Sequence, residues 1–345
     1  MPSRRRTNNH IELNTLSLSD FTKLADVIWN KAYTGIVQTM RGSGLVKEVS
    51  IPQNSGNTRE FTEIDTEEYA KKKGQGAQAD RAKIQQGYSK VMTMYRVGMD
   101  IGITYEMKTQ NKYPEVVAQL TGNATQVAKR IDLDLSHRIT FCDAVTYVDM
   151  DGDTISISLG DTLALASSVH TLRGSASTYR NILANNPKLS KGALESMERL
   201  VTEETLNQFG EKMTMEFNIL WTTDDPNTVN TAKEYLQSTA DITGSNAGVT
   251  NVYASKYKHV ILPRVATTAT GGVDTTKRYY WGLASSAASS FYLGIWEEAR
   301  MKASTPGNNA EEFSTDDQLF GSRGGLGITI VSGAFFKVSK GNGVA

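Results

Sequence analysis

Four histidines and one cysteine are the side chains of this 345-residue sequence best suited to metal binding or nucleophilic chemistry. They are His10, His137, His170, His259 and Cys142. No histidine has another histidine at a metal-ligand spacing, and a single cysteine excludes a zinc site built from cysteines. His137 and Cys142 lie five residues apart, a poor helical spacing for a catalytic pair. We therefore interpret these residues as structural.

The segment Asp149–Thr154 (DMDGDT) is similar to part of a calcium-binding loop. An EF-hand loop has glycine at position six and glutamate at position twelve, whereas counting from Asp149 puts glycine at position four and Gly160 at position twelve. The better prediction is a hairpin turning at Asp151-Gly152.

Glycine-rich stretches are the remaining candidates for a phosphate-binding loop. Gly74–Gly76 and Gly321–Gly327 match neither common phosphate-binding pattern, and the sequence has no G-x-S-x-G or H-E-x-x-H motif. We expect flexible or sharply turning backbone there. The sequence thus predicts no catalytic, metal or cofactor-binding residues and no enzymatic activity.

The composition indicates a folded, water-soluble chain. Hydrophobic residues make up 39% of it, and the 37 basic residues equal the 37 acidic ones, so the surplus of positive charge typical of nucleic-acid binders is missing. One basic cluster, Arg4–Arg6, is interpreted as a solvated tail or a DNA contact. There is no signal peptide and no apolar run long enough for a membrane span. We expect a reducing, soluble compartment.

Strict alternation of apolar and polar residues over Val91–Met107 predicts one long strand. Its odd positions, which include Val97, Ile101 and Ile103, are mostly apolar, whereas its even positions include Arg96, Asp100 and Glu106. At ~3.3 Å per residue the strand would be roughly 56 Å long, well beyond the usual strand of about 5–6 residues. We expect that its own domain cannot cover the whole apolar face.

Regular elements on both sides of this strand complete an α+β pattern. The expected segments are a helix over Phe21–Tyr33 capped by Ser19 or Asp20, extended Leu45–Pro52 and Thr58–Asp65, a polar hairpin tip Thr66–Gly87, a long helix Glu115–Cys142, a helix after Ser190, a strand Glu216–Trp221, a helix capped by Asp225 with Pro226 first, a strand Tyr257–Pro263 and a strand-like tail Gly324–Ser339.

This order of hairpin, long helix, α/β lobe and returning strand resembles that of the major capsid proteins of tailed bacteriophages, which have the Hong Kong 97-type fold. Later segments resemble the Mu-like branch of that family. The matching segments are DGDT, LALASSVHTLRG, YRNILANNPKLSKGALESMERL, FGEKMTMEFNILWTTDDPNTVNTAKEYLQS, NVYASKYKHVILPR and RYYWGLASS. Two segments differ from the branch. LALASSVH lacks the phenylalanine that the branch has there, and ILWTTDDP is less apolar than the corresponding strand ending of the branch.

The resemblance implies a domain organisation. It comprises an N-terminal arm and helix (1–43), an extended E-loop hairpin (44–108), a peripheral domain (109–188) whose spine helix is 115–142, an axial domain (189–300) and a return to the peripheral domain (301–345). Because only a short arm precedes the E-loop, a separate scaffolding protein is expected.

The resemblance also implies a function: a structural subunit that self-assembles, as pentamers and hexamers, into the icosahedral shell around the double-stranded DNA of a tailed phage. The implied partners are other copies of the chain, a scaffolding protein, a portal and decoration proteins, with packaged DNA bound only non-specifically and no membrane. The implied location is the virion capsid, assembled in the host bacterial cytoplasm. A tail-tube subunit and a soluble α+β enzyme are the alternatives.

The long strand then has an explanation, since its apolar face would lie against a neighbouring subunit. The hypothesis names Val97, Ile101 and Ile103 as residues of this intersubunit contact. Lys71–Lys73 on the hairpin invite comparison with the lysine–asparagine cross-link of the best-known family member, but no matching motif accompanies them. We interpret them as a solvated charge run.

Overall fold

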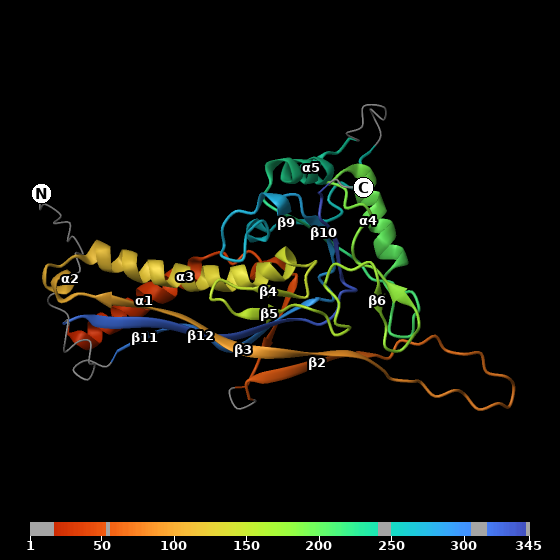
Figure 1. Cartoon of the computed structure of the whole chain (residues 1–345), viewed down its shortest axis with the longest axis horizontal. Helices are drawn as coiled ribbons and strands as arrows, with labels where there is room; N and C mark the ends of the chain where they lie inside the picture. Colours follow the sequence, from red (N-terminus) through yellow and green to blue (C-terminus); the bar gives the residue numbers. More distant parts are fainter. Residues whose placement is uncertain (1–16, 53–55, 241–249, 305–315, 343–345) are drawn as a thin grey trace, which may run out of the picture. The chain divides into compact units, whose positions relative to one another are not determined.

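The computed structural model describes residues 17–52, 56–240, 250–304 and 316–342 of the chain (Figure 1). The α-helices of this part are α1 (Leu18–Gly35), α2 (Tyr105–Thr109), α3 (Tyr113–Thr140), α4 (Lys191–Glu203) and α5 (Pro226–Gln237). None of the helices found there is both long and apolar enough to cross a membrane. Residues 1–16 of the expected arm, with the Arg4–Arg6 cluster, lie outside the described residues.

Two larger sheets and two small hairpins contain the strands of the described residues. One sheet has the order β1 (Val46–Ser50), β11 (Phe291–Ala303), β12 (Gln318–Ile330), β3 (Gln85–Ile103) and β2 (Thr58–Asp65). The other has the order β13 (Phe336–Ser339), β10 (Trp281–Ala284), β8 (Ile219–Thr222) and β9 (Lys258–Ile261). The hairpins pair β4 (Thr146–Val148) with β5 (Thr154–Ser156), and β6 (His170–Thr171) with β7 (Thr178–Tyr179). Helices and strands are thus mixed, as an α+β fold requires.

The chain divides into two compact units, each built from three separate segments. Unit 1 contains residues 1–38, 95–131 and 296–326, and unit 2 contains residues 39–94, 132–295 and 327–345.

Unit 1 has a core formed by α1, α3 and the neighbouring strands. Phe21 packs edge-on against Phe320 with ring centroids 5.7 Å apart, and Ile103 and Leu120 are buried in the same cluster. The Trp29 indole donates a 2.8 Å hydrogen bond to the side-chain carbonyl of Asn123, so both polar groups of this contact are satisfied without water.

The main core of unit 2 lies between the second sheet and helices α4 and α5. Apolar positions at helical spacing bury one face of each helix against the sheet, as the hydrophobic stripes predict. The buried members of this cluster include Leu194, Met197, Leu200, Ala232, Leu236, Leu220, Trp281 and Leu283. Ser190 and Asp225 accept hydrogen bonds from the first turns of α4 and α5, which confirms both predicted caps.

Helix α3 confirms the predicted long helix, with bounds two residues earlier at each end. Leu135 and Ile139, on the predicted apolar stripe, are fully buried. On the same helix, the buried Asp132 carboxylate accepts a hydrogen bond from the Met40 backbone N–H at 2.8 Å. It also forms an ion pair with Arg264 at 2.7 Å. This polar residue therefore ties two distant segments of unit 2 to the helix.

Several details of the sequence prediction are wrong. The predicted strand Val91–Met107 ends at Ile103, because the following residues form helix α2, whose N-cap is Thr104. Helix α1 begins earlier than expected, because Ser17, and not Ser19 or Asp20, is the N-cap whose side chain accepts from the backbone of Asp20.

The turn at Asp151-Gly152 is confirmed, since β4 and β5 pair and the Asp149 carboxylate accepts from the backbone N–H groups of Asp151 and Asp153.

The predicted apolar face of the long strand is also wrong. The buried positions change from even to odd residue numbers between Met92 and Ile103 of β3. Met92 and Met94, at even positions, are buried, whereas at the far end the odd position Ile103 is buried. Between these points the Ser322 hydroxyl bonds both the N–H and the carbonyl of Met99, at 3.1 and 3.0 Å. The inward face thus changes parity along the strand.

Candidate functional site: the root of the long hairpin

Strands β2 and β3 form the predicted antiparallel hairpin, and residues 66–84 join them (Figure 1). The joining segment has no helix or strand, and its side chains are largely exposed, including Tyr69 at 70% and Ile84 at 74%. Residues 85–87, expected in the tip, belong to β3 instead. The outer edge of β2 is an edge of its sheet within the described residues.

Acidic residues of β2 hold the hairpin root, residues 58–67 and 85–94, to the loop that follows α4. The Glu63 carboxylate accepts a 2.8 Å hydrogen bond from the Gln208 side-chain amide. The Asp65 carboxylate accepts from the Gln208 backbone N–H at 2.9 Å, and the Glu67 carbonyl accepts from the Asn207 side chain at 2.8 Å. Two alternate residues of β2, together with Glu67 just beyond its end, therefore contact the same two loop residues.

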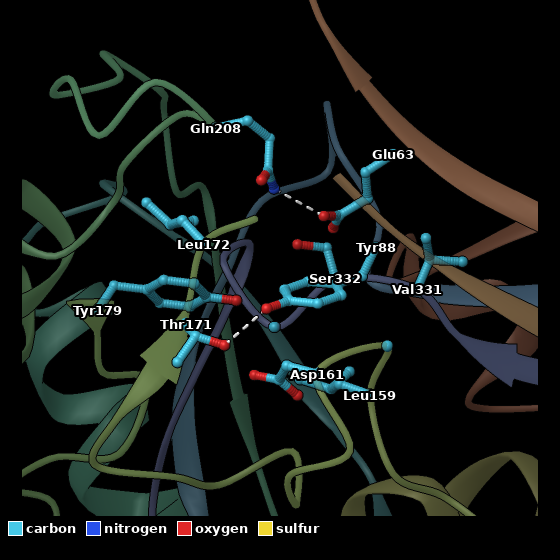
Figure 2. A pocket seen from close by; sticks show the side chains of 12 residues that line it. Glu63, Tyr88, Leu159, Asp161, Thr171, Leu172, Tyr179, Gln208, Val331 and Ser332 are labelled. Carbon is cyan, nitrogen blue, oxygen red and sulfur yellow. Dashed lines mark hydrogen bonds between the residues drawn. The ribbon is translucent and has the colours of Figure 1, made fainter. Parts of the chain in front are cut away.

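Strand β3 adds further polar contacts to the hairpin root. The hydroxyls of Tyr88 and Thr171 lie 2.9 Å apart, as Figure 2 shows. Lys90 donates to Ser158 at 3.0 Å, and Arg173 donates to the Gly87 carbonyl at 3.3 Å. The root of the hairpin is thus held by these hydrogen bonds together with the buried side chains of Met92 and Met94.

Gly87 is required where the two strands change register. The pairing shifts between Thr62 and Ile64, which leaves an extra residue of β3 opposite Glu63. A Cβ atom at Gly87 would lie 2.8 Å from the Cβ of Glu63 and 2.9 Å from the Cδ of Gln208. The structure thus shows a close approach of two side chains to this glycine.

A small cavity of about 10 Å³, large enough for roughly one water molecule, lies between the hairpin root and the segments that contact it (Figure 2). Its lining includes Glu63, Tyr88, Asp161, Tyr179 and Ser332. Burial raises the pKa of Glu63 to about 7; a hydrogen bond from Ser332 opposes this rise, and the Asp161 and Asp65 carboxylates add to it. The cavity is too small for an organic substrate.

Next to the cavity is a buried pair that the sequence did not reveal. The Asp161 carboxylate lies 2.7 Å from His170 Nδ1, and both side chains are almost fully buried. The second ring nitrogen, Nε2, lies 3.2 Å from the Leu165 carbonyl and from the side-chain oxygen of Asn181. Asp161 and His170 are nine positions apart in the sequence, and neither hydrophobic periodicity nor a known motif predicts that they pair.

A weak sequence signal for Glu63 does exist. Strand alternation puts Glu63 on the same face as Phe61, and Phe61 packs against the buried cluster of Met92 and Met94. An acid two residues after an inward-facing aromatic residue therefore points inward as well. The sequence analysis did not use this signal.

The structure treats the three residues of the expected intersubunit contact differently. Ile103 is only 2% exposed and is covered by its own chain in the unit 1 core, whereas Ile101 and Val97 are partly exposed. The exposed apolar side chains of β3 are instead Val91 at 53% and Met99 at 49%. In the subunit conformation described, Ile103 is unavailable to a neighbour.

The residues first considered for catalysis do not come together in a reactive group. Among the described residues, no group of three or more histidine, cysteine, aspartate or glutamate side chains is arranged to hold a metal ion. Cys142 is fully buried, and burial raises its pKa to about 12, so it is a poor nucleophile in the folded chain. Gly321–Gly327 lie within strand β12 and form no phosphate-binding loop.

No protein-family model matches the chain, and no curated protein is significantly similar to it in sequence. Among solved structures, a chain from Gordonia phage Cozz is similar, with a TM-score of 0.51 and 12% identity, covering 88% of this chain and 89% of that chain. Chains from the capsid of cyanophage P-SCSP1u (TM-score 0.48, 13% identity, 84% of each chain) and the mature capsid of bacteriophage PhiM1 (0.46, 12%, 86% and 85%) are less similar. The first of these similarities shows a shared fold. The assignment to the Mu-like branch stays a prediction.

Proposed function

We propose that the chain is a major capsid subunit that self-assembles into the icosahedral shell enclosing the double-stranded DNA genome of a tailed phage. The observation that carries this proposal is the fold shared with a phage chain over 88% of the sequence. The order of elements in the sequence, which resembles the Hong Kong 97-type capsid fold, supports the same function. A structural role also fits the hairpin, whose joining segment 66–84 is exposed in a single subunit.

The domain organisation is part of this proposal. Residues 44–108 would be the E-loop, 109–188 together with 301–345 the peripheral domain, and 189–300 the axial domain. The antiparallel pairing of β2 with β3 and the 28-residue helix α3 support the E-loop and the spine helix. The arm, 1–43, would include helix α1.

The proposed partners are other copies of the chain in pentamers and hexamers, a separate scaffolding protein, a portal and decoration proteins. Packaged DNA would be bound only non-specifically, because the formal net charge is zero and a strongly basic lining would hold the genome through counterion release. The proposed location is the virion capsid, with assembly in the host bacterial cytoplasm. We expect no enzymatic turnover.

For the intersubunit contact, we propose that Val97 and Ile101 take part through their exposed surface. Val91 and Met99 on the same strand extend the exposed apolar surface and join this proposal. Ile103 would contribute only by supporting the strand from inside the unit 1 core.

The test is assembly of the purified chain, alone and with the scaffolding protein of its phage, followed by sedimentation and negative-stain electron microscopy. Closed shells of uniform diameter would support the proposal. Tubes would favour the tail-tube alternative, and a chain that stays monomeric under all conditions while turning over a small substrate would favour the enzyme.

Two variants locate the contact. Val97→Asp should fold normally and fail to form shells, because a charge would be desolvated in the contact. Glu60→Gln, at an exposed position of β2, is the matched control and should assemble like the parent. Normal shells from Val97→Asp would remove this residue from the contact.

A further inference from the structure

The Glu63 carboxyl group stands in surroundings that suit its neutral form better than its charged form. Its hydrogen-bond partners are the side chains of Gln208 and Ser332, which are both uncharged. The charged groups that act on it, among the described residues, are the carboxylates of Asp161 and Asp65. A carboxylate largely removed from water normally requires a cation or several N–H donors, and the partly buried Glu63 carboxylate has a single amide and one hydroxyl.

The remaining titratable groups around the cavity do not supply a cation to Glu63. His170 lies against Asp161, and the Arg173 guanidinium donates to the backbone carbonyl of Gly87. The phenols of Tyr88 and Tyr179 line the cavity, and burial raises the pKa of Tyr179 well above its ordinary value. Beyond Tyr179 lies Lys337, whose amine bonds the carbonyls of Arg180 and Glu204.

We propose that Glu63 is a proton-operated latch, which holds the root of the hairpin in place while its carboxyl group is protonated and loosens the root when the proton is lost. The position of Glu63 makes this effect mechanical. The residue lies on β2, its partners Gln208 and Ser332 lie on segments outside the hairpin, and Gly87 leaves no free space beside it. Separation of the hairpin root from those segments would give a negative charge at Glu63 more water than the adjoining cavity, which has room for roughly one molecule.

The direction of the pH dependence follows from the pKa. The held state raises the pKa of Glu63 from an ordinary 4.5 to about 7. The stabilisation of the held state is therefore complete below about pH 4.5, decreases as the pH rises, and is lost above about pH 7. The difference of about 2.5 pKa units corresponds to a change on the order of a hundredfold in the opening equilibrium of the root.

This inference concerns contacts within one chain and does not depend on the proposed capsid function. The test is hydrogen exchange of the full-length monomeric chain between pH 5.5 and 8.5, corrected for the intrinsic pH dependence of exchange. Peptides that cover β2 and residues 85–94 report on the hairpin root, and peptides from α4 serve as an internal reference. We expect protection of the root to fall at least tenfold across this range while that of α4 stays constant.

Glu63→Gln carries a neutral amide of the same shape, so its hairpin root should stay protected at every pH. Glu60→Gln, on the exposed side of the same strand, should retain the pH dependence of the parent chain. An equal pH dependence in Glu63→Gln and the parent would overturn the proposal, because the responsible proton would then bind at another group. A parent chain with no pH dependence at the root would overturn it as well.

A second variant keeps the test decisive if Glu63→Gln does not fold. The hydrogen bond from Ser332 lowers the pKa of Glu63, so Ser332→Ala should raise that pKa and move the midpoint of the loss of protection to higher pH. An unchanged midpoint, or a shift to lower pH, would contradict the assignment of the titrating group to Glu63.

Discussion

Replacement of Ile103 by alanine should destabilise the folded subunit itself. The side chain is 2% exposed and packs in a cluster with Phe21, Leu120 and Phe320. Three carbon atoms are removed, which at about 0.8 kcal/mol each gives roughly 2.4 kcal/mol of lost transfer free energy. The cavity left behind adds to this, so we expect the free energy of unfolding to fall by about 2–5 kcal/mol.

Val97→Ala on the same strand is the matched comparison. Two carbons are removed from a partly exposed side chain, and the expected loss of unfolding free energy is below about 1 kcal/mol. If Val97 takes part in the intersubunit contact, this variant should still weaken assembly. The two substitutions therefore separate stability of the subunit from stability of the shell.

Urea unfolding of the monomeric chain, followed by circular dichroism, gives the midpoint of the transition for each variant, and sedimentation gives the assembled fraction. An unchanged midpoint for Ile103→Ala together with lost assembly would refute the reasoning. Ile103 would then face a neighbouring subunit, as the strand alternation alone suggested. A large loss of stability with Val97→Ala would equally contradict the assigned burial.

Three further predictions concern single buried groups. Trp29→Phe leaves the Asn123 side-chain carbonyl without its 2.8 Å hydrogen bond and should lower the unfolding free energy by about 1–3 kcal/mol in urea titrations; a loss below about 0.5 kcal/mol would contradict the contact. Burial lowers the pKa of Lys337 from 10.5 to about 7, so above pH 7 the unfolded chain binds more protons than the folded chain, and the free energy of unfolding should rise from pH 7 to 9. Lys337→Met should reduce the slope of unfolding free energy against pH. Equal slopes in the parent and the variant would assign the effect to other groups. The Cys142 thiol should react with Ellman's reagent only in denaturant, because it is fully buried; stoichiometric labelling in native buffer would disprove that burial.

Local structure was predictable wherever the physics is local. Helix α3 follows from apolar residues at intervals of three and four, and the caps of α4 and α5 follow from Ser190 and Asp225. The turn at Asp151-Gly152 follows from side-chain preferences within six residues. These interactions join residues close in sequence, so spacing alone is enough to predict them.

The long strand shows where such reasoning ends. Alternation predicted a strand and a pairing partner, and both are present as β3 and β2. It did not predict the reversal of the buried face, because Met92 and Met94 pack in one buried cluster and Ile103 packs in another, and both clusters contain residues distant in sequence. Whether Ile103 faces its own core or a neighbouring subunit depends on the chain segments that cover it. The alternation of apolar and polar residues in the strand does not decide this.

The sequence by itself determined the longer helices, the hairpin strands and their order, but not helix α2 or strand β11. Only the tertiary structure brought Glu63, Gln208 and Ser332 together, from three segments separated by more than a hundred residues. The pKa of a carboxyl group depends on which atoms replace water around it, and those atoms are set by packing between distant segments. For this reason the hairpin was predictable from the order of residues, while the group proposed to control it was not.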